Sequence, residues 1–307
     1  MHPRRRRHLF HRYKYWRTRL REGLLLPWGG ARALGARLAG RFRVRRLELP
    51  CPALPAGLEG FTVTHLTDLH CGPNADPRQH LPPVVEAVRG LGSDLIAITG
   101  DWVDHRLDWL DVAAPYLREL EAPLGVWGVL GNHDLLENKA RMVRRLRDLL
   151  GERLLLNNAA VLGRGGARLG LLGLDFAYGN TRWRRHLARA RARLAALGPA
   201  PDFLLALAHD PDLWDPLRAQ AGADLTLSGH THGGQIALQP EPAPSIGAAF
   251  NFKYRRGLYQ KDGKYLYVSN GLAQSIPVRW NCPTEVVQLT LLRAEEVSSA
   301  DFANDAD

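Results

Sequence analysis

The chain has 307 residues, 45% of them hydrophobic, which is enough for one large core or at most two domains. Its three cysteines, Cys51, Cys71 and Cys282, form no CxxC motif and cannot all pair, which argues against a disulfide framework and favours a reducing compartment. The net charge of +10 is unevenly distributed: residues 1–50 hold 15 Lys and Arg against two acidic residues, whereas the remainder holds 26 against 29. The basic excess therefore lies in an N-terminal arm, and the rest of the chain is slightly acidic.

The arm, residues 1–48, interleaves arginines with aromatic and leucine side chains. Its longest uncharged stretch is nine residues, Gly23–Ala31, whereas a membrane-spanning helix needs about 20 apolar residues. The arm also lacks the apolar region and cleavage site of a good signal peptide. Arginines mixed with aromatic side chains suit an anionic membrane surface, which we expect the arm to bind. Nucleic acid and a solvated, partly disordered tail are the alternatives.

After a Pro-rich linker, apolar runs alternate with helical patterns. The apolar runs predict strands within residues 61–70, 94–104, 125–134, 168–175, 202–210, 224–232, 264–271 and 285–292. The helical patterns cover residues 81–92, 107–120, 138–150 and 183–197. This alternation predicts an α/β domain, residues 49–293, with a largely parallel or mixed sheet core. Residues 294–307 read as an acidic, frayed tail.

Polar clusters follow five of the predicted strands. In chain order they are Asp68-x-His70, Gly100-Asp101-x-x-Asp104, Gly131-Asn132-His133-Asp134, His209 and Gly229-His230-Thr231-His232. Each cluster alone is weak evidence, because such short patterns are also common in turns. In open α/β sheets, however, the loops at the carboxyl ends of the strands gather at one edge, where ligands bind. Five clusters at strand ends therefore predict one common site.

His230 and His232 lie two residues apart among glycines. On a continuing strand, residues two apart point to the same face, so the two imidazoles would be neighbours. Neutral imidazoles make good metal ligands, and a mixture of nitrogen and oxygen ligands suits Mn, Fe, Zn or Co rather than a thiolate site. A polar turn that happens to hold two histidines is the alternative for this stretch.

The ordered motifs DxH, GDxxD, GNH[DE], H and GHxH, complete across residues 68–232, resemble those of the calcineurin-like metallophosphoesterases. The resemblance implies a four-layer α-β-β-α sandwich of two mixed sheets. Four further segments are similar to the bacterial membrane-associated phosphodiesterases of the YkuE and YaeI type, so that the likeness covers roughly residues 45–293. These segments are GHTHGGQI (229–236), YRRGLY (254–259), YVSNGLAQS (267–275) and IPVRWNCPTEV (276–286).

The resemblance also implies two divalent metal ions. One would be held by Asp68, His70, Asp101 and His232, and the other by Asp101, Asn132, His209 and His230. Asp101 would bridge them, because a carboxylate has two oxygens and offsets the charge of two cations. Two metals about 3.5–4 Å apart favour in-line phosphoryl displacement, and metal coordination lowers the pKa of a bound water to about 7.

Further roles follow from the same resemblance. His133 would assist the attack of a metal-bridging hydroxide on phosphorus, and Asp104 would orient His133. A loop cap is the alternative role for Asp104. Asn132 and His133 are expected to contact the substrate. Arg279 is a candidate for contacting the substrate phosphate, with a surface or structural role as the alternative.

These observations favour a binuclear metal-dependent phosphodiesterase acting at or near a membrane surface, with a lipid-linked diester, such as a nucleotide-sugar lipid pyrophosphate, as one candidate substrate. His105 stands where protein Ser/Thr phosphatases of the superfamily carry an arginine, which favours diesters. A nuclease is the first alternative, disfavoured by the slightly acidic body. A non-catalytic scaffold is the second, disfavoured by the complete ligand set. We expect a bacterial protein, cytoplasmic or peripheral on the cytoplasmic face of the inner membrane, with export left open.

Overall fold

The computed structural model describes residues 42–178, 181–237, 245–247, 252–273 and 279–294. Nearly all of the expected arm and tail lies outside these residues. The described helices are α3 (Pro77–Leu91), α4 (Asp108–Leu117), α5 (Lys139–Leu150), α6 (Arg182–Ala195) and the short α7 (Trp214–Pro216). Among the described residues, no helix is long and apolar enough to cross a membrane.

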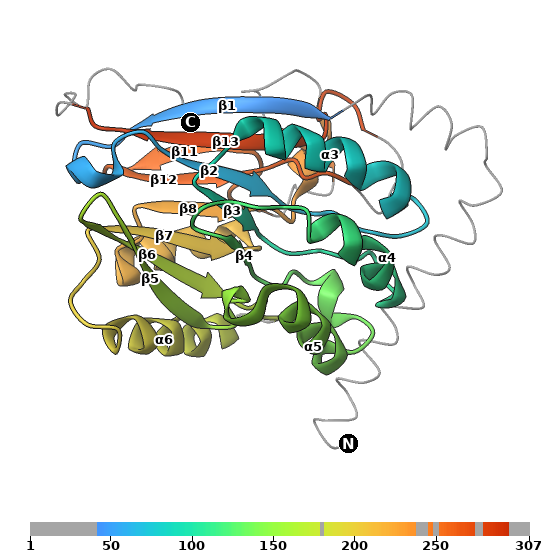
Figure 1. Cartoon of the computed structure of the whole chain (residues 1–307), viewed down its shortest axis with the longest axis horizontal. Helices are drawn as coiled ribbons and strands as arrows, with labels where there is room; N and C mark the ends of the chain where they lie inside the picture. The colour runs from blue at the N-terminus through green and yellow to red at the C-terminus, as the bar shows by residue number, and fades with distance from the viewer. Residues whose placement is uncertain (1–41, 179–180, 238–244, 248–251, 274–278, 295–307) are drawn as a thin grey trace.

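Two sheets of mixed direction form the centre of the molecule (Figure 1). The first has the order β1-β13-β2-β3-β4, with bounds β1 (Arg43–Pro50), β13 (Glu285–Leu292), β2 (Phe61–Leu66), β3 (Leu95–Ile98) and β4 (Val126–Gly128). The second has the order β11-β12-β8-β7-β6-β5, with bounds β11 (Gly257–Lys261), β12 (Lys264–Val268), β8 (Leu225–Ser228), β7 (Phe203–Ala208), β6 (Ala167–Leu174) and β5 (Asn158–Arg164). A separate two-stranded ribbon pairs β9 (Gln235–Ala237) with β10 (Ser245–Gly247).

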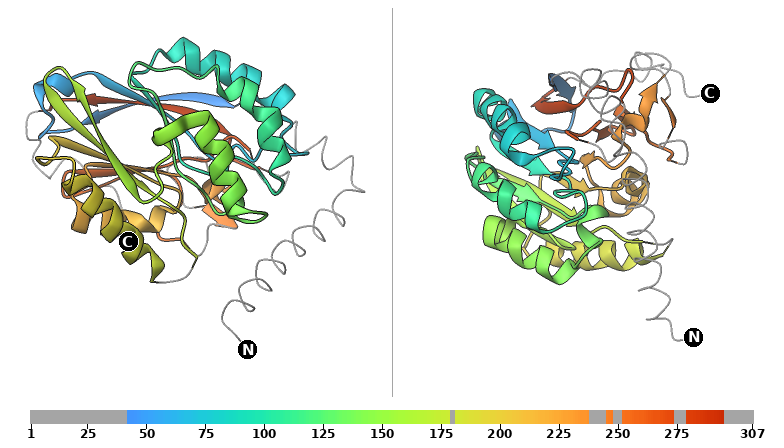
Figure 2. Two further views of the ribbon diagram at one scale, coloured as in Figure 1. Left: turned by 60° about the horizontal axis from the view of Figure 1, so that its bottom comes forward. Right: turned by 90° about the vertical axis from the view of Figure 1, so that its right-hand side faces the viewer.

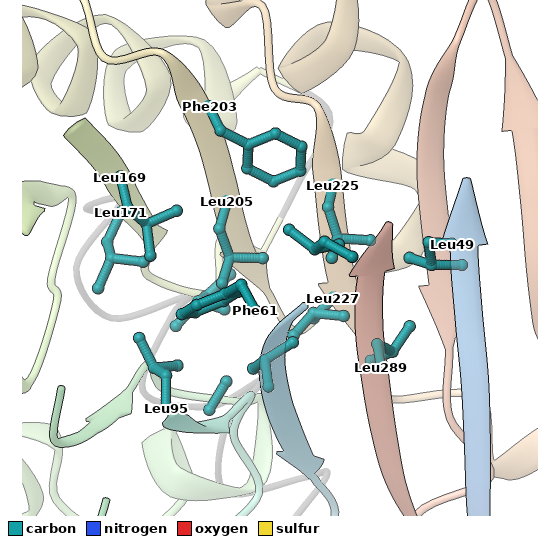
Figure 3. Close-up of a cluster of buried hydrophobic side chains, with 14 of the residues drawn as sticks. Leu49, Phe61, Leu95, Leu169, Leu171, Phe203, Leu205, Leu225, Leu227 and Leu289 are labelled. Atoms are coloured by element: carbon teal, nitrogen blue, oxygen red, sulfur yellow. The ribbon is translucent and has the colours of Figure 1, made fainter. Parts of the chain in front are cut away.

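A large hydrophobic cluster lies between the two sheets (Figure 3). Leu95 and Leu289 from the first sheet meet Leu171, Leu205 and Leu227 from the second. A second cluster packs α3, α4 and α5 against the outer face of the first sheet, and a third packs α6 against the outer face of the second. The layers are therefore helices, sheet, sheet and helices (Figure 2), which confirms the predicted α-β-β-α sandwich.

The folded domain begins earlier than residue 49. Arg43–Pro50 form β1, which pairs in parallel with Glu285–Leu292 along its whole length. The strand carries several charges because it lies at the edge of the sheet, where charged side chains can remain in water. Leu49, by contrast, is fully buried. Residues 43–48, which the sequence assigned to the arm, thus belong to the sheet.

Several predicted strands end sooner than expected. The apolar run 94–104 contributes only Leu95–Ile98, and the run 224–232 contributes only Leu225–Ser228. The polar residues that follow form loops instead of continuing the ladder. Helix α3 starts four residues before its predicted start, where the Asp76 side chain accepts a hydrogen bond from the backbone N–H of Arg78 and Pro77 occupies the first turn. The structure also adds β5 and β11, which no predicted strand covered.

Candidate metal centre

The loops that follow β2, β3, β4, β7 and β8 converge at the carboxyl ends of these strands. They bring together all seven side chains predicted as metal ligands. Four belong to loops of the first sheet and three to loops of the second, so the cluster lies where the two sheets meet. The seven are Asp68, His70, Asp101 and Asn132 from the first sheet, and His209, His230 and His232 from the second.

Five of these residues have left-handed backbone conformations, which non-glycine residues adopt rarely. Their φ angles are 52° at Asp68, 40° at His70, 53° at Asp101, 73° at His230 and 52° at His232. Such strain costs about 1–3 kcal/mol per residue and persists only where the surroundings enforce it. Here the loops brace one another: the backbone N–H of Asp68 donates to the carbonyl of Gly100 at 3.0 Å, and that of His70 donates to the carbonyl of Asp101 at 2.9 Å.

This backbone corrects the argument for His230 and His232. Strand β8 ends at Ser228, so the two imidazoles do not share a strand face. They come close to other members of the cluster because left-handed turns at both residues redirect the chain. The prediction that the two imidazoles are neighbours on one strand face was therefore wrong, although each of them lies in one of the two groups of the cluster.

One group of potential ligands surrounds Asp68. Asp68 Oδ1 lies 3.7 Å from His70 Nε2 and 3.6 Å from His232 Nε2, and these two nitrogens are 3.2 Å apart. Both Asp68 and His70 are buried. Three donor atoms at such separations could bind one cation.

A second group surrounds Asp101. His209 Nε2 lies 3.2 Å from Asp101 Oδ2 and 3.2 Å from Asn132 Oδ1, and His230 offers a further nitrogen within 4.8 Å of those of Asp101 and His209. Asp101 Oδ2 is also 3.5 Å from His70 Nε2. This carboxylate therefore lies between the two groups, where a bridging ligand would have to be.

Two of the four imidazoles in the cluster are held neutral, whereas at His70 and His209 the neighbouring carboxylates outweigh burial and raise the pKa to about 10 and about 9, so that a bound cation would displace those protons. Burial lowers the pKa of both His230 and His232 to about 3, which keeps these imidazoles neutral and able to coordinate. Burial opposes ionisation of Asp68, but nearby histidines, led by His232, hold the pKa of its carboxyl well below the usual range. Within the described part of the chain, buried Asp68 Oδ1 has no hydrogen-bond partner. A buried carboxylate oxygen left in this way is costly, and a metal ion would satisfy it.

Outer contacts fix the ligand orientations. His209 Nδ1 donates to the backbone carbonyl of Thr99 at 2.7 Å, which leaves Nε2 directed at the cluster. Asp134 accepts hydrogen bonds from the backbone N–H groups of Gly131, Asp101 and Trp102 at 2.8–2.9 Å. It thereby ties two ligand-bearing loops together.

His133 and Asp104 lie beside the first group. His133 Nδ1 donates to the backbone carbonyl of Asp104 at 2.6 Å and lies 3.3 Å from Asp104 Oδ1. The same carboxylate lies 3.4 Å from His70 Nδ1 and 2.8 Å from His105 Nδ1. Asp104 is thus surrounded by three imidazoles, and the cap position of α4 is occupied by Leu107.

Residues 61–234 match the family model described as calcineurin-like phosphoesterase, which is more than half of the chain. The chain belongs to the calcineurin-like phosphoesterase family. The match begins at the first residue of β2 and ends two residues beyond His232, so it contains all seven predicted ligands.

Curated members of the family align with most of the chain. The uncharacterized metallophosphoesterase YkuE of Bacillus subtilis is 30% identical over 78% of this chain and 81% of its own length. An uncharacterized metallophosphoesterase of Aquifex aeolicus is also 30% identical, over 81% of this chain and 91% of its own length. The transmembrane protein with metallophosphoesterase domain of Bos taurus is 30% identical over 82% of this chain, which spans only 57% of that protein.

Solved structures are more distant. A dimetal phosphatase from Danio rerio shares 16% sequence identity, with a TM-score of 0.46 over 71% of this chain and 90% of that one. Structural similarity this low gives no information about the activity of the chain.

Arg279, the candidate phosphate contact, is held mainly by backbone carbonyls. Its side chain is buried and donates to the backbone carbonyls of Ala273 at 2.7 Å and Cys282 at 3.1 Å. It also lies 3.5 Å from the carbonyl of His232. These contacts, with a separation of 3.5 Å between the guanidinium and His232 Nδ1, hold Arg279 against the His232 loop and fit its structural alternative, and contact with the substrate phosphate stays a prediction.

Aromatic residues beside the second group were missed by the sequence reasoning. The ring of Phe176 lies 5.3 Å from that of His230, and the ring of Phe252 lies 5.0 Å from it. The Tyr178 hydroxyl donates to the carbonyl of Asn132 at 2.9 Å. The only sequence signal was the position of Phe176 and Tyr178 directly after a predicted strand, because Phe252 comes from a distant segment.

Proposed function

We propose that this chain is a binuclear metal-dependent phosphodiesterase. The observation that carries the proposal is the convergence of seven nitrogen and oxygen donors from both sheets in two groups that meet at Asp101, one of which contains the buried, unsatisfied Asp68 Oδ1. Asp68, His70 and His232 would hold one ion, His209, His230 and Asn132 the other, and Asp101 both. Two divalent ions bound there would supply a water of lowered pKa and neutralise charge on the phosphoryl oxygens.

The residues of the chain prepare this chemistry. The bond from His133 Nδ1 to the carbonyl of Asp104 fixes the tautomer, so that Nε2 is the nitrogen left to exchange a proton with substrate. We assign to His133 Nε2 the hydrogen bond to a phosphoryl or leaving oxygen. The Asp104 carboxylate lies beside His133 Nδ1 and His70 Nδ1. It therefore orients both His133 and His70, which is one of the proposed metal ligands.

The proposed preference for diesters depends on His105. This buried imidazole faces the Asp104 carboxylate. A fixed arginine at such a place would favour the dianionic phosphate of a monoester, because a guanidinium binds two phosphate oxygens at once. The presence of His105 in place of an arginine therefore supports a monoanionic diester as the substrate.

Hydrolysis by the Mn²⁺-loaded protein tests the proposal. Wild type should cleave bis(p-nitrophenyl) phosphate faster than p-nitrophenyl phosphate, and Asp101→Asn and His230→Ala should lose the activity while keeping the far-ultraviolet circular dichroism of wild type. Asp108→Asn, at an exposed position paired with Arg106, is the matched control and should remain active. Full turnover in both cluster variants would refute the assignment, and a faster monoester would refute the diester preference.

We further propose that the enzyme acts at an anionic membrane surface, on the cytoplasmic leaflet. The basic and aromatic composition of residues 1–41 supports this, and the relative from Bos taurus is described as a transmembrane protein. Removal of residues 1–41 should weaken binding to vesicles containing phosphatidylglycerol without changing turnover of a soluble diester. Equal vesicle binding with and without these residues would contradict the proposal.

A further inference from the structure

The slightly acidic composition after residue 50 conceals a strong separation of charge. Of the 26 Lys and Arg in this part of the chain, 11 lie in α5 and α6, and of its 29 acidic residues these helices hold only Asp148. Helix α6 carries six arginines, and no Asp or Glu occurs between residues 176 and 201. The two helices thus form a basic region within an otherwise acidic domain.

Most of these basic side chains point into solvent without a counterion. Within the described residues, Arg185, Arg189, Arg191 and Arg193 are exposed and form no ion pair or hydrogen bond through their side chains, and neither do Arg141, Arg144 and Arg147 of α5. Arg145 and Lys139 do have partners, in Asp111 and Asp175. Arg185, Arg189 and Arg193 are four residues apart and therefore form one stripe along α6.

Helix α5 covers the outer face of the first sheet and α6 that of the second, but both helices lie along the same edge of the sandwich. Both run along the lower side in Figure 1, and both come forward when that side is turned to the viewer (Figure 2, left). Both also begin near the candidate metal centre: α5 follows the loop of His133, and α6 follows the loop of Phe176 and Tyr178. We call the exposed arginines of α5 and α6 together the basic face.

A groove with a mixed lining adjoins the basic face. It has a volume of about 520 Å³ and lies beside the C-terminal half of α6, where apolar side chains such as Leu194, Pro201 and Leu204 line it together with Arg191, Gln220 and Asp224. Next to it, Leu197 is 46% exposed, one of the few large apolar side chains left in water among the described residues. A surface that combines unpaired arginines with the exposed Leu197 and the leucines of a partly apolar groove matches a ligand that has both phosphate and hydrocarbon.

We propose that the basic face is a docking surface for an anionic phospholipid bilayer. The arginine stripe would bind the headgroup phosphates, and the groove would contact the apolar part of a lipid. Arginine suits phosphate because its guanidinium donates two parallel hydrogen bonds. A nucleic acid would use the charges but offers no hydrocarbon for the groove and Leu197. This inference concerns binding alone and does not depend on the proposed hydrolysis.

Vesicle co-sedimentation of the full chain tests the inference. The variant Arg185→Gln/Arg189→Gln/Arg193→Gln should bind vesicles of phosphatidylcholine with phosphatidylglycerol about tenfold more weakly than wild type, because each basic side chain near an anionic surface contributes to binding. The matched control Arg46→Gln/Lys261→Gln/Arg293→Gln removes the same charge from exposed positions outside both helices and should bind like wild type. Equal losses in the two variants would show a nonspecific charge effect and overturn the proposal.

A second variant separates a bilayer from a polynucleotide. Leu197→Ser, at a position exposed enough to tolerate the change, should weaken vesicle binding and leave binding to duplex DNA unchanged. If the triple α6 variant lost DNA binding while vesicle binding persisted, the basic face would be a nucleic-acid surface instead. Because neither measurement requires turnover, a catalytically silent wild type would leave this test intact.

Discussion

Asp68 and Asp101 show how closely the backbone is packed around the candidate metal centre. A Cβ added at Gly131 would lie 2.1 Å from Asp101 Oδ1 and 2.5 Å from the backbone nitrogen of Asp101, and one at Gly229 would lie 2.2 Å from Asp68 Oδ2. No side chain fits at these distances. The glycines of the GNH and GHxH motifs are thus required by contact with the two carboxylates, rather than by a positive φ.

Gly131→Ala should therefore displace Asp101 and weaken metal binding. We expect at least a tenfold higher dissociation constant for Mn²⁺, since misplacing a contact to a ligand typically costs 10–100-fold in affinity. Isothermal titration calorimetry measures the effect. Gly163→Ala is the control, because a Cβ there meets nothing within 4 Å. An unchanged Mn²⁺ affinity in Gly131→Ala would show that Asp101 does not bind the metal.

His133→Ala separates a catalytic role from a ligand role. His133 is bonded to Asp104 and stands beside the seven donors, so its loss should leave the metal content unchanged and lower turnover of a diester by about 10²–10⁴-fold. Elemental analysis and initial rates measure the two quantities. Loss of bound metal from this variant would instead place His133 among the ligands.

At the scale of elements, β1 illustrates why charged strands are difficult to recognise. Its side chains Arg43, Arg45, Arg46 and Glu48 suggest a solvated segment, yet the strand is held by parallel pairing with β13 and by the burial of Leu49. The pairing partner is more than 230 residues away, so no local pattern could reveal it.

Leu49→Ala should destabilise the domain by about 2–4 kcal/mol, because the removed atoms leave a cavity between the sheets. Val44→Ala in the same strand is the control. Val44 is 40% exposed, and its truncation should cost less than about 1 kcal/mol. Urea unfolding at equilibrium compares the two. If both variants were as stable as wild type, β1 would contribute little to the fold.

At the scale of the whole molecule, the candidate metal centre joins the two sheets. Its ligands on the first sheet come from three loops and those on the second sheet from two, so bound ions would link halves that otherwise meet mainly through the hydrophobic cluster of Figure 3. Metal binding should consequently stabilise the whole fold as well as the site.

Addition of Mn²⁺ to metal-free protein should raise Tm by several degrees. Ligand at about 100 times its dissociation constant stabilises the native state by about 2.7 kcal/mol, and for a domain of this size each kcal/mol raises Tm by about 2–4 °C. Differential scanning calorimetry measures the change. Asp101→Asn should lose most of the increase, whereas Asp108→Asn should keep it. A Tm that does not respond to any divalent transition metal would argue against the centre.

The sequence by itself determined the fold class, most of the strands and helices, and which seven side chains meet in the candidate metal centre. Apolar periodicity and the order of five short motifs are local properties, and each motif directly follows a strand. The resemblance carried by these motifs agrees with the family match over residues 61–234.

Only the tertiary structure decided the rest, because it depends on contacts between distant segments. The left-handed turns at His230 and His232, the pairing of β1 with β13 and the aromatic ring of Phe252 beside His230 all involve such contacts. The sequence left two roles open for Arg279, a phosphate contact and a structural role. The structure shows that its side chain is buried and bonded to the backbone carbonyls of Ala273 and Cys282. The basic face likewise depends on the tertiary structure, which brings α5 and α6 to the same edge of the sandwich, since the sum of charges along a chain does not show where they gather in space.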